Sequence, residues 1–432
     1  MNHMEEMVCT GCSLLCDDVA ASEEGGVVSS LGFCRLGHVH LESAAEHAEA
    51  SGVVREGKKL NTVSVNDAIT KAADMLVSGE RVLLYGWSHS TDETVEEGLD
   101  LATTLGGFFD SNASMAMAQS LSHEIHSMKL GIDLEYVRNN GEFVIYWGSD
   151  PTESSHRHPS RFAVLPRGEK IPEGIESRTI GVVDIRETET MKMANHRIII
   201  PSGSDAELLN AISAEVSGDS SITGPVAGVA PTELLGLVRG LQKSDCTVIF
   251  YGTGIMNSKH FGSNLDSLSG LVKALRRSGK EAYALPMSHD SNIMGAIKTS
   301  NDATGSPATF DYASGSPGAS SNSTALQKLV AGEFDSSLVV GCDSLAEMPG
   351  PAARALASTN LVYVGRPGGL TERKAAVSIF TTEDILTGAG TMHRSDFVEV
   401  GMKSLGTRIK GPLTQLEALK KIHEKVRQGS KE

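Results

Sequence analysis

Three cysteines, Cys9, Cys12 and Cys16, lie in one short segment near the start of the chain, and Cys34 follows within the sequence GFCRLGH. This spacing offers four soft thiolates, and such a set can hold a [4Fe-4S] cluster with one cysteine on each iron. Zinc is an alternative, although zinc sites favour two paired Cys-x2-Cys units and this chain has one. A thiol set that binds no metal is the third reading. We therefore predict Cys9, Cys12, Cys16 and Cys34 as metal ligands, with the [4Fe-4S] cluster as the favoured cofactor.

The other two cysteines, Cys246 and Cys342, stand alone inside apolar runs, where buried and unreactive thiols are the usual finding. Clustered cysteines in a cytoplasmic chain favour metal binding over disulfides. Asp17 and Asp18 directly follow the third clustered cysteine, and their negative charge would lower the reduction potential of a cluster.

The overall charge excludes several classes of partner. The chain has 38 Lys and Arg against 54 Asp and Glu, a formal net charge of -16, which repels nucleic acid and anionic lipid. No stretch approaches the roughly 20 apolar residues that span a bilayer, and the first residues are acidic, unlike a secretory signal. We predict a cytoplasmic protein with no nucleic-acid or membrane partner.

Short apolar runs alternate with amphipathic segments along the rest of the chain. With 432 residues, two or three packed units are expected. Each apolar run breaks into a polar loop, as buried strands of a parallel sheet do. The fold class predicted is α/β, with an N-terminal iron-sulfur-type segment followed by two doubly wound, Rossmann-like halves. The predicted strands lie in residues 81–88, 143–151, 179–188, 246–254, 337–344 and 360–369.

These patterns predict four domains in sequence order. They are a cysteine-rich domain at 1–60, a first α/β domain at 61–230, a second at 231–375, and a C-terminal segment with a helix at 376–432. Residues 305–324 are rich in Gly, Ser and Pro, which predicts an exposed loop within the second α/β domain.

Several motifs together resemble one enzyme family. CTGCSLLCDDV, CRLGH, YGWS, DSNAS, YWGSDP and VVDIRET are similar to the B subunit of formylmethanofuran dehydrogenase, a relative of the molybdopterin-dependent formate dehydrogenases. The resemblance spans nearly the whole chain. It implies a formate-dehydrogenase-like fold in which the iron-sulfur domain passes electrons to molybdenum or tungsten, held by two pterin dinucleotides between the two halves. It also implies partner subunits of the A, C and D types, one of which attaches the formate to methanofuran.

The resemblance implies a set of cofactor-binding residues in this chain. Arginine forks suit dinucleotide phosphates, but the same arginines can make ordinary ion pairs, and loop glycines can serve the fold alone. The predicted cofactor-binding residues are Gly86, Trp87, Gly148, Arg157, His158, Arg161 and Arg394.

The positions that carry redox chemistry in the family differ in this chain. The family's metal-ligand stretch, of the type DNTASVCHGPS, matches residues 110–120, where Ala116 replaces the ligand Cys and Met117 the His. A methyl group cannot coordinate a metal, and a thioether is a poor substitute for a thiolate. Ser288 stands where the family has an active-site Arg. We therefore predict no catalytic residue.

Three functional hypotheses remain open. The first is a noncatalytic B-type subunit, as in the bacterial formyltransferase/hydrolase complex of tetrahydromethanopterin-linked one-carbon metabolism. The second is an active formylmethanofuran dehydrogenase subunit whose molybdenum or tungsten is bound by the two pterins without a protein thiolate. The third is that the cysteines bind a cluster or zinc only to fix the N-terminal segment.

Overall fold

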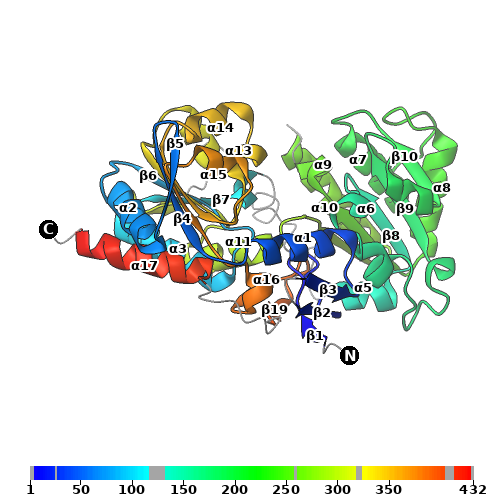
Figure 1. Ribbon diagram of the computed structural model, residues 1–432. Helices are drawn as coiled ribbons and strands as arrows, with labels where there is room; N and C mark the ends of the chain where they lie inside the picture. Colours follow the sequence, from blue (N-terminus) through cyan, green and yellow to red (C-terminus); the bar gives the residue numbers. More distant parts are fainter. Residues whose placement is uncertain are drawn as a thin grey trace. The chain divides into compact units, whose positions relative to one another are not determined.

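The computed structural model describes residues 4–24, 27–115, 132–256, 260–317, 324–403 and 413–429. The chain divides into two compact units. Unit 1 comprises residues 1–115, 290–394 and 399–432, and unit 2 comprises residues 116–289 and 395–398. Figure 1 shows the elements of both units.

Unit 1 begins with the cysteine segment. In the described part of this segment, a three-stranded antiparallel sheet has the order β1-β2-β3, and the loop with Cys9, Cys12 and Cys16 joins its first two strands. Cys34 directly precedes the helix that follows. The elements are β1 (Glu5–Met7), β2 (Val19–Glu24), β3 (Val27–Leu31) and α1 (Arg35–Glu46).

A nine-stranded sheet, counted over the described residues, forms the body of unit 1 in the order β14-β13-β7-β6-β15-β16-β17-β4-β5. The five strands from β7 to β17 run parallel, and the outer pairs on both sides are antiparallel. The strands are β4 (Ser51–Glu56), β5 (Lys59–Val63), β6 (Val82–Gly86), β7 (Phe108–Ser111), β13 (Phe310–Asp311), β14 (Ser316–Pro317), β15 (Ser336–Val340), β16 (Asn360–Gly365) and β17 (Val377–Phe380).

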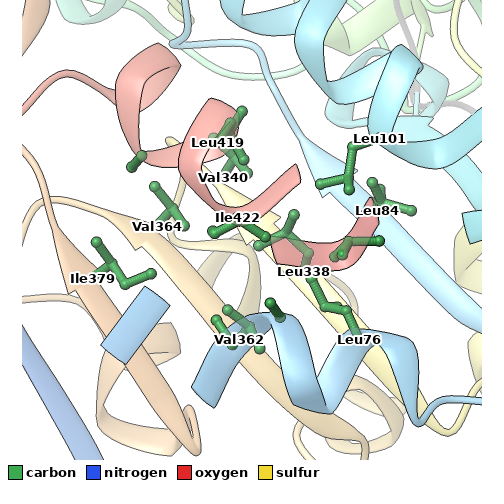
Figure 2. Packing of buried hydrophobic residues seen from close by; sticks show 14 of the residues in the cluster. Leu76, Leu84, Leu101, Leu338, Val340, Val362, Val364, Ile379, Leu419 and Ile422 are labelled. Carbon is green, nitrogen blue, oxygen red and sulfur yellow. The ribbon is translucent and has the colours of Figure 1, made fainter. Parts of the chain in front are cut away.

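The central strands are buried on both faces, as the continuous apolar runs predict. Leu84 packs into one hydrophobic core, and its neighbour Leu83 points to the opposite face and packs into another, because successive strand residues alternate. Figure 2 shows the first core, in which Leu338 and Val364 of the sheet meet Leu419 of the C-terminal helix.

Helices cover both faces of this sheet. Figure 1 shows the C-terminal helix α17 beside α2 and α3, and it packs against both. Ser64 caps α2 by accepting a hydrogen bond from Asp67 N. The helices and small strands of unit 1 are α2 (Val65–Val77), α3 (Asp92–Leu105), η1 (Asn112–Met115), α11 (Ile293–Thr304), α12 (Ala325–Val330), α13 (Ser344–Glu347), α14 (Gly350–Leu356), α15 (Leu370–Lys374), α16 (Asp384–Thr387), β18 (Thr391–His393), β19 (Glu399–Gly401) and α17 (Gln415–Gly429).

Unit 2 is built on a parallel sheet that has five strands among the described residues, in the order β10-β9-β8-β11-β12. The strands are β8 (Phe143–Trp147), β9 (Thr179–Asp184), β10 (His196–Ile199), β11 (Cys246–Tyr251) and β12 (Glu281–Pro286). The helices are α5 (Leu134–Asn140), α6 (Pro151–Ser154), η3 (Pro159–Ala163), η4 (Gly174–Ser177), η5 (Glu189–Met193), α7 (Asp205–Ser217), α8 (Pro231–Lys243), α9 (Thr253–Met256) and α10 (Phe261–Arg277).

Both sheets contain a point where the strand order reverses. In unit 2 the chain builds outward from β8 in one direction and from β11 in the other, and in unit 1 the reversal falls between β6 and β15. Open α/β sheets bind ligands at such points, outside the carboxyl ends of the strands.

Each of the two large sheets contains strands from both of the predicted α/β segments. Strand β6, from the segment 61–230, pairs with β15, from the segment 231–375, while β8 pairs with β11. The apolar runs locate strands, but pairing partners depend on contacts that are distant in sequence. Part of the segment 305–324 also enters the large sheet, since β13 pairs with β7; residues 318–323 of that segment lie outside the described residues.

Candidate functional site

The cysteine loop is closed by its own backbone. Cys9 N donates to Cys16 O at 2.9 Å, and Leu15 N donates to Cys12 O at 3.3 Å. Leu15 adopts a left-handed conformation with φ 41°, and it packs beside Val8 against Met392 and Met402. This packing holds the loop on the body of unit 1.

Two glycines bring the fourth cysteine close to the loop. A side chain at Gly37, on α1, would place its Cβ 2.6 Å from Cys9 Sγ, and one at Gly11 would approach Gly37 Cα to 3.0 Å. The N–H of Gly11 also donates to Cys9 Sγ at 3.4 Å. Cys34 occupies the residue before α1, so the start of this helix lies against the loop. Because Gly11 and Gly37 have no side chains, space remains beside Cys9 Sγ.

None of the four cysteines forms a disulfide; Cys9, Cys12 and Cys16 are buried and Cys34 is partly exposed. Burial raises the pKa of Cys9, and the neighbouring Cys12, Cys16 and Cys34 raise it further through like-charge repulsion. The four thiols are thus close enough to interact. Among the described residues, no group of three or more His, Cys, Asp or Glu side chains is arranged so that it could hold a metal ion.

A polar chain links the cysteine loop to the neighbouring cavity. Thr10 Oγ1 and His40 Nε2 are hydrogen-bonded at 2.8 Å, and the same His40 nitrogen lies 3.4 Å from Glu383 Oε2. Glu383 Oε1 in turn lies 3.7 Å from Arg366 Nη1. Burial lowers the pKa of His40, which outweighs the opposite effect of Glu383, so this imidazole is neutral at pH 7.

The cavity has a volume of about 490 Å³ and lies within unit 1. Its wall includes Thr10 and Gly11 of the cysteine loop, and Cys342 after strand β15. Burial raises the pKa of Asp384 to about 8, with a further contribution from Glu383, so its carboxyl group is largely protonated at pH 7. The carboxyl groups in the wall are those of Asp343, Glu347, Glu383 and Asp384.

The cavity lies at the order reversal of the unit 1 sheet. Gly86 ends β6 with φ 122°, and a Cβ there would approach Val340 O to 2.2 Å and Cys342 Sγ to 3.0 Å. Only a glycine allows the ends of β6 and β15 to come this close. Unit 2 has the same feature, because a Cβ on Gly148 would lie 3.0 Å from Gly254 Cα.

No family model matches the chain. Two curated relatives match it along nearly their whole length. The chain is 29% identical over 432 residues to the B subunit of the tungsten-containing formylmethanofuran dehydrogenase 2 of Methanocaldococcus jannaschii, and the match covers 98% of this chain and 99% of the relative. It is 28% identical over 440 residues to the B subunit of the enzyme of the same name from Methanococcus maripaludis, with 99% of each covered. The chain is thus similar to the B subunits of these two formylmethanofuran dehydrogenases over 98% and 99% of its residues.

Solved structures confirm the predicted fold class. The crystal structure of the formyltransferase/hydrolase complex FhcABCD from Methylorubrum extorquens with methylofuran matches at a TM-score of 0.66 and 18% identity, over 88% of this chain and 100% of that chain. Acetylene hydratase from Pelobacter acetylenicus matches at a TM-score of 0.65 and 11% identity, over 99% of this chain and 70% of that chain. At these identities the likeness shows the α/β fold. Across the described residues, no helix has the length and apolar character needed to cross a membrane.

The residues that the family resemblance implied for cofactor binding are spread over both units. In unit 1, Gly86 lies at the order reversal, but Trp87 is fully buried and stacks on Phe109 with ring centroids 5.2 Å apart. Its ring also occupies the space that a side chain at Gly98 would need. Trp87 is therefore a core residue. Arg394 follows β18 and is 6% exposed.

The other implied residues lie in unit 2. His158 is 1% exposed, shares a hydrogen bond of 3.0 Å with Tyr146 OH, and meets the Phe250 ring edge-on at 4.4 Å between centroids. Burial lowers its pKa to about 3, so it stays uncharged. Arg161 lies over the Phe162 ring at 4.7 Å, and Arg157 is partly exposed. His158 is thus a buried, uncharged side chain in contact with Tyr146 and Phe250, and its role at a cofactor stays a prediction.

The replaced positions of the metal-ligand stretch lie only partly within the described residues. Ala116 and Met117 lie outside them, and Ser288, which follows β12, is 9% exposed. The residues before Ala116 are held by Asp110, a buried carboxyl group that accepts from Ala325 N at 2.7 Å and from Ser111 N at 2.8 Å. Burial raises the Asp110 pKa to about 6 despite these bonds. This carboxyl group fixes the backbone that leads to position 116.

Sequence reasoning missed several residues that shape the cavity. Asp343 accepts hydrogen bonds from Leu370 N and Thr371 N at 2.7 Å each, and Glu372 accepts one from Gly368 N at 2.8 Å. An acidic residue near the end of the predicted strand at 337–344 was the available signal. Its partners come from another strand end, and no local pattern identifies them.

Proposed function

We propose that this chain is the B-type subunit of a complex related to formylmethanofuran dehydrogenase and to the formyltransferase/hydrolase complex. It would assemble in the cytoplasm with subunits of the A, C and D types and carry no redox catalysis of its own. The full-length identity of 29% and 28% to two B subunits supports the assignment to such a complex. The structural likeness to a chain of FhcABCD, a complex of four kinds of subunit, supports a four-subunit assembly.

Ala116 is the observation that carries the noncatalytic part of the proposal. The family that the sequence resembles binds molybdenum or tungsten through a Cys or selenocysteine at this position, and the alanine methyl group has no donor atom. Met117 and Ser288 replace the neighbouring His and the distant Arg of the family pattern. The loss of all three side chains supports a subunit in which formyl transfer and hydrolysis take place on other chains.

We also propose that Cys9, Cys12, Cys16 and Cys34 hold a [4Fe-4S] cluster. When bound, such a cluster supplies one-electron transfer or a structural cross-link. A cubane takes one thiolate on each of four irons, and the four cysteines supply that number of ligands. Gly37 leaves room beside Cys9 Sγ, Gly11 N–H donates to that sulfur, and burial of three thiols excludes water.

Elemental analysis of the intact complex tests both proposals. The complex is purified anaerobically from cells supplied with tungstate and molybdate, and iron, sulfide, tungsten and molybdenum are counted per B-type subunit. We expect about four iron atoms and no stoichiometric tungsten or molybdenum. The complex should fail to reduce viologen dyes with formylmethanofuran while it still transfers and hydrolyses the formyl group. The M. jannaschii enzyme, prepared in parallel, is the positive control. One tungsten or molybdenum atom per subunit would refute the noncatalytic assignment.

A second candidate function is an active dehydrogenase subunit in which the two pterins alone hold the metal. The complete set of four cysteines favours it, because an electron-transfer cluster has a purpose when a redox centre is nearby. Dye reduction dependent on formylmethanofuran would select this alternative. If the cysteines serve only to fix the N-terminal segment, Cys12→Ser should impair assembly and leave the turnover of assembled complex unchanged.

A further inference from the structure

The unit 1 cavity lies where an open α/β sheet offers a phosphate site. The loop after β15, with Gly341 and Asp343, and the loop after β16, with Gly368 and Gly369, both line it. Such loops bind the phosphates of nucleotides when their backbone N–H groups point to the ligand. Where these N–H groups point therefore decides whether a dinucleotide fits.

In this chain three N–H groups of the loop after β16 are bonded to the chain's own carboxylates. Asp343 accepts from Leu370 N, Thr371 N and Thr371 Oγ1, the last at 2.6 Å. Glu372 accepts from Gly368 N. Pro367, in the same loop, has no N–H to offer. Two carboxylates thus already bind three backbone donors beside the cavity, which are not available to a diphosphate.

The space between Gly369 and the Asp343 carboxylate is also filled. A Cβ on Gly369 would lie 2.9 Å from both Cγ and Oδ2 of Asp343, so backbone and carboxylate are already in close contact. A phosphate group could accept from Leu370 N and Thr371 N only if Asp343 left its three hydrogen bonds. Hydrogen bonds to charged groups are among the stronger ones in proteins, so this displacement is costly.

The remaining charges in the wall are unfavourable to an anion as well. Arg366 is the only lysine or arginine among the described residues that line the cavity, and the Glu383 carboxylate, 3.7 Å away, already offsets its charge. Glu347 adds another carboxylate, which accepts from Asn112 Nδ2 at 3.0 Å. Burial raises the pKa of Cys342, and the Glu347 charge raises it further, as expected in a negative field.

We propose that the unit 1 cavity rejects diphosphate-bearing dinucleotides, because its wall is acidic and because Asp343 and Glu372 already bind backbone N–H groups of the adjoining loop after β16. The subunit then holds fewer pterin dinucleotides than the two that the family resemblance implies. This inference goes beyond the proposed function, which concerns the protein ligand to the metal and rests on position 116.

Two measurements on the purified complex test this inference. First, pterin is released, oxidised to its fluorescent derivative and counted per B-type subunit, and we expect at most one. Second, pyrophosphate and GDP are titrated by calorimetry, and we expect dissociation constants weaker than roughly 1 mM, which corresponds to about -4 kcal/mol. Two pterins per subunit, or micromolar pyrophosphate binding at this cavity, would overturn the inference.

Variants test whether Asp343 and Glu372 cause the cavity to reject diphosphates. Asp343→Asn combined with Glu372→Gln removes both charges, and we expect pyrophosphate affinity to rise at least tenfold. Glu372→Gln alone should give a smaller gain, and it serves as the second variant if the double variant does not assemble. The matched control is Glu189→Gln with Asp302→Asn, two carboxylates whose side chains are 63% and 60% exposed, which should leave the affinity unchanged. Equal affinity in the double variant and the control would contradict the role of Asp343 and Glu372.

The outcomes separate this inference from the proposed function. Two pterins per subunit without tungsten or molybdenum would contradict the cavity inference and leave the noncatalytic assignment intact. One pterin per subunit together with stoichiometric tungsten or molybdenum would contradict the noncatalytic assignment and leave the cavity inference intact.

Discussion

The cysteine segment and the cavity of unit 1 share the residues Thr10 and Gly11, yet they treat ligand donors in opposite ways. In the cysteine segment every thiol is present, and Gly37 and Gly11 leave space around Cys9 Sγ. Beside the cavity, backbone donors of the loop after β16 are already bonded to Asp343 and Glu372. The same fold therefore leaves space around one set of ligand donors and pairs another set with its own carboxylates, so the likeness in fold does not decide which cofactors the chain holds.

The largest effect is expected on iron content, when one cysteine of the segment is removed. This change tests whether the cysteine segment binds the proposed cluster. Cys12→Ser deletes one of the four proposed thiolates, and we expect iron to fall from about four atoms per chain to less than one, since a cubane needs a ligand on each iron. Iron and acid-labile sulfide are measured on anaerobically purified complex. Cys246→Ser, also a change at a buried thiol, is the control and should retain full iron. Full iron in Cys12→Ser would remove this residue from the ligand set.

A smaller effect is expected when the space beside Cys9 is filled. Gly37→Ala places a Cβ 2.6 Å from Cys9 Sγ and 2.9 Å from Phe33 Cδ1, and we expect a loss of about 1–3 kcal/mol in the free energy of unfolding through overpacking. Iron content should fall with it. Thermal unfolding and iron analysis measure the two effects.

A second helical glycine provides the matched control for this substitution. Gly270→Ala, inside α10, meets no atom within 4 Å and should stabilise by about 0.5–1 kcal/mol, because alanine is the better helix former. If Gly37→Ala behaved like Gly270→Ala, the close contact with Cys9 would have no energetic consequence.

The stability of the folded chain should depend on pH through Asp384, a buried carboxyl group in the acidic wall of the cavity. Its folded pKa of about 8 lies above the ordinary value of 3.8, so the folded state retains the proton more strongly than the unfolded state does. Stability from this group is present at low pH and is lost as pH rises from 3.8 to about 8, by about 1.4 kcal/mol per pH unit within that window. Asp384→Asn has no such proton to lose, so its stability relative to wild type should increase across the window.

Chemical unfolding at several pH values measures this difference. Asp302→Asn, whose side chain is exposed, is the control and should follow the wild-type profile. A constant difference between wild type and Asp384→Asn from pH 4 to pH 8 would show that Asp384 is ionised throughout, against the pKa given above.

The smallest effect is expected from restoring the family's reactive side chains. Ala116→Cys combined with Met117→His and Ser288→Arg supplies the ligand and its two neighbours, but Asp343 and Glu372 still bind the N–H groups of the loop beside the cavity. We expect no gain in tungsten or molybdenum, measured by elemental analysis of complex grown with both metals. The same triple change combined with Asp343→Asn and Glu372→Gln is the informative comparison. Stoichiometric metal in the triple variant alone would show that the cavity is not the barrier.

Local sequence patterns predicted the elements more successfully than their partners. The strand predicted at 246–254 is β11 (Cys246–Tyr251), and the strand predicted at 360–369 is β16 (Asn360–Gly365), because continuous apolar runs and glycine stops are local signals. The pairing of β6 with β15 was not predictable in this way, since more than half the chain separates the two strands.

The same limit applies to the candidate site. Cysteine spacing identified the four thiols, but the contact of Gly37 with Cys9 depends on how α1 returns to the loop. His158 was expected at a cofactor, and its packing between Tyr146 and Phe250 could not be foreseen, because strands β8 and β11 set its environment rather than its own neighbours in sequence. Residues whose surroundings depend on distant partners are the ones that sequence analysis describes least well.

The strand order of the two sheets has a consequence for how the chain is made. Among the described residues, the strands of the unit 2 sheet all come from the stretch 143–286, whereas β6 and β7 of unit 1 are made long before β15, β16 and β17, and their core also needs α17. During synthesis the second unit can therefore close its sheet while the first still exposes apolar strands on the ribosome. Nascent chains should depend on chaperone protection until α17 has been made.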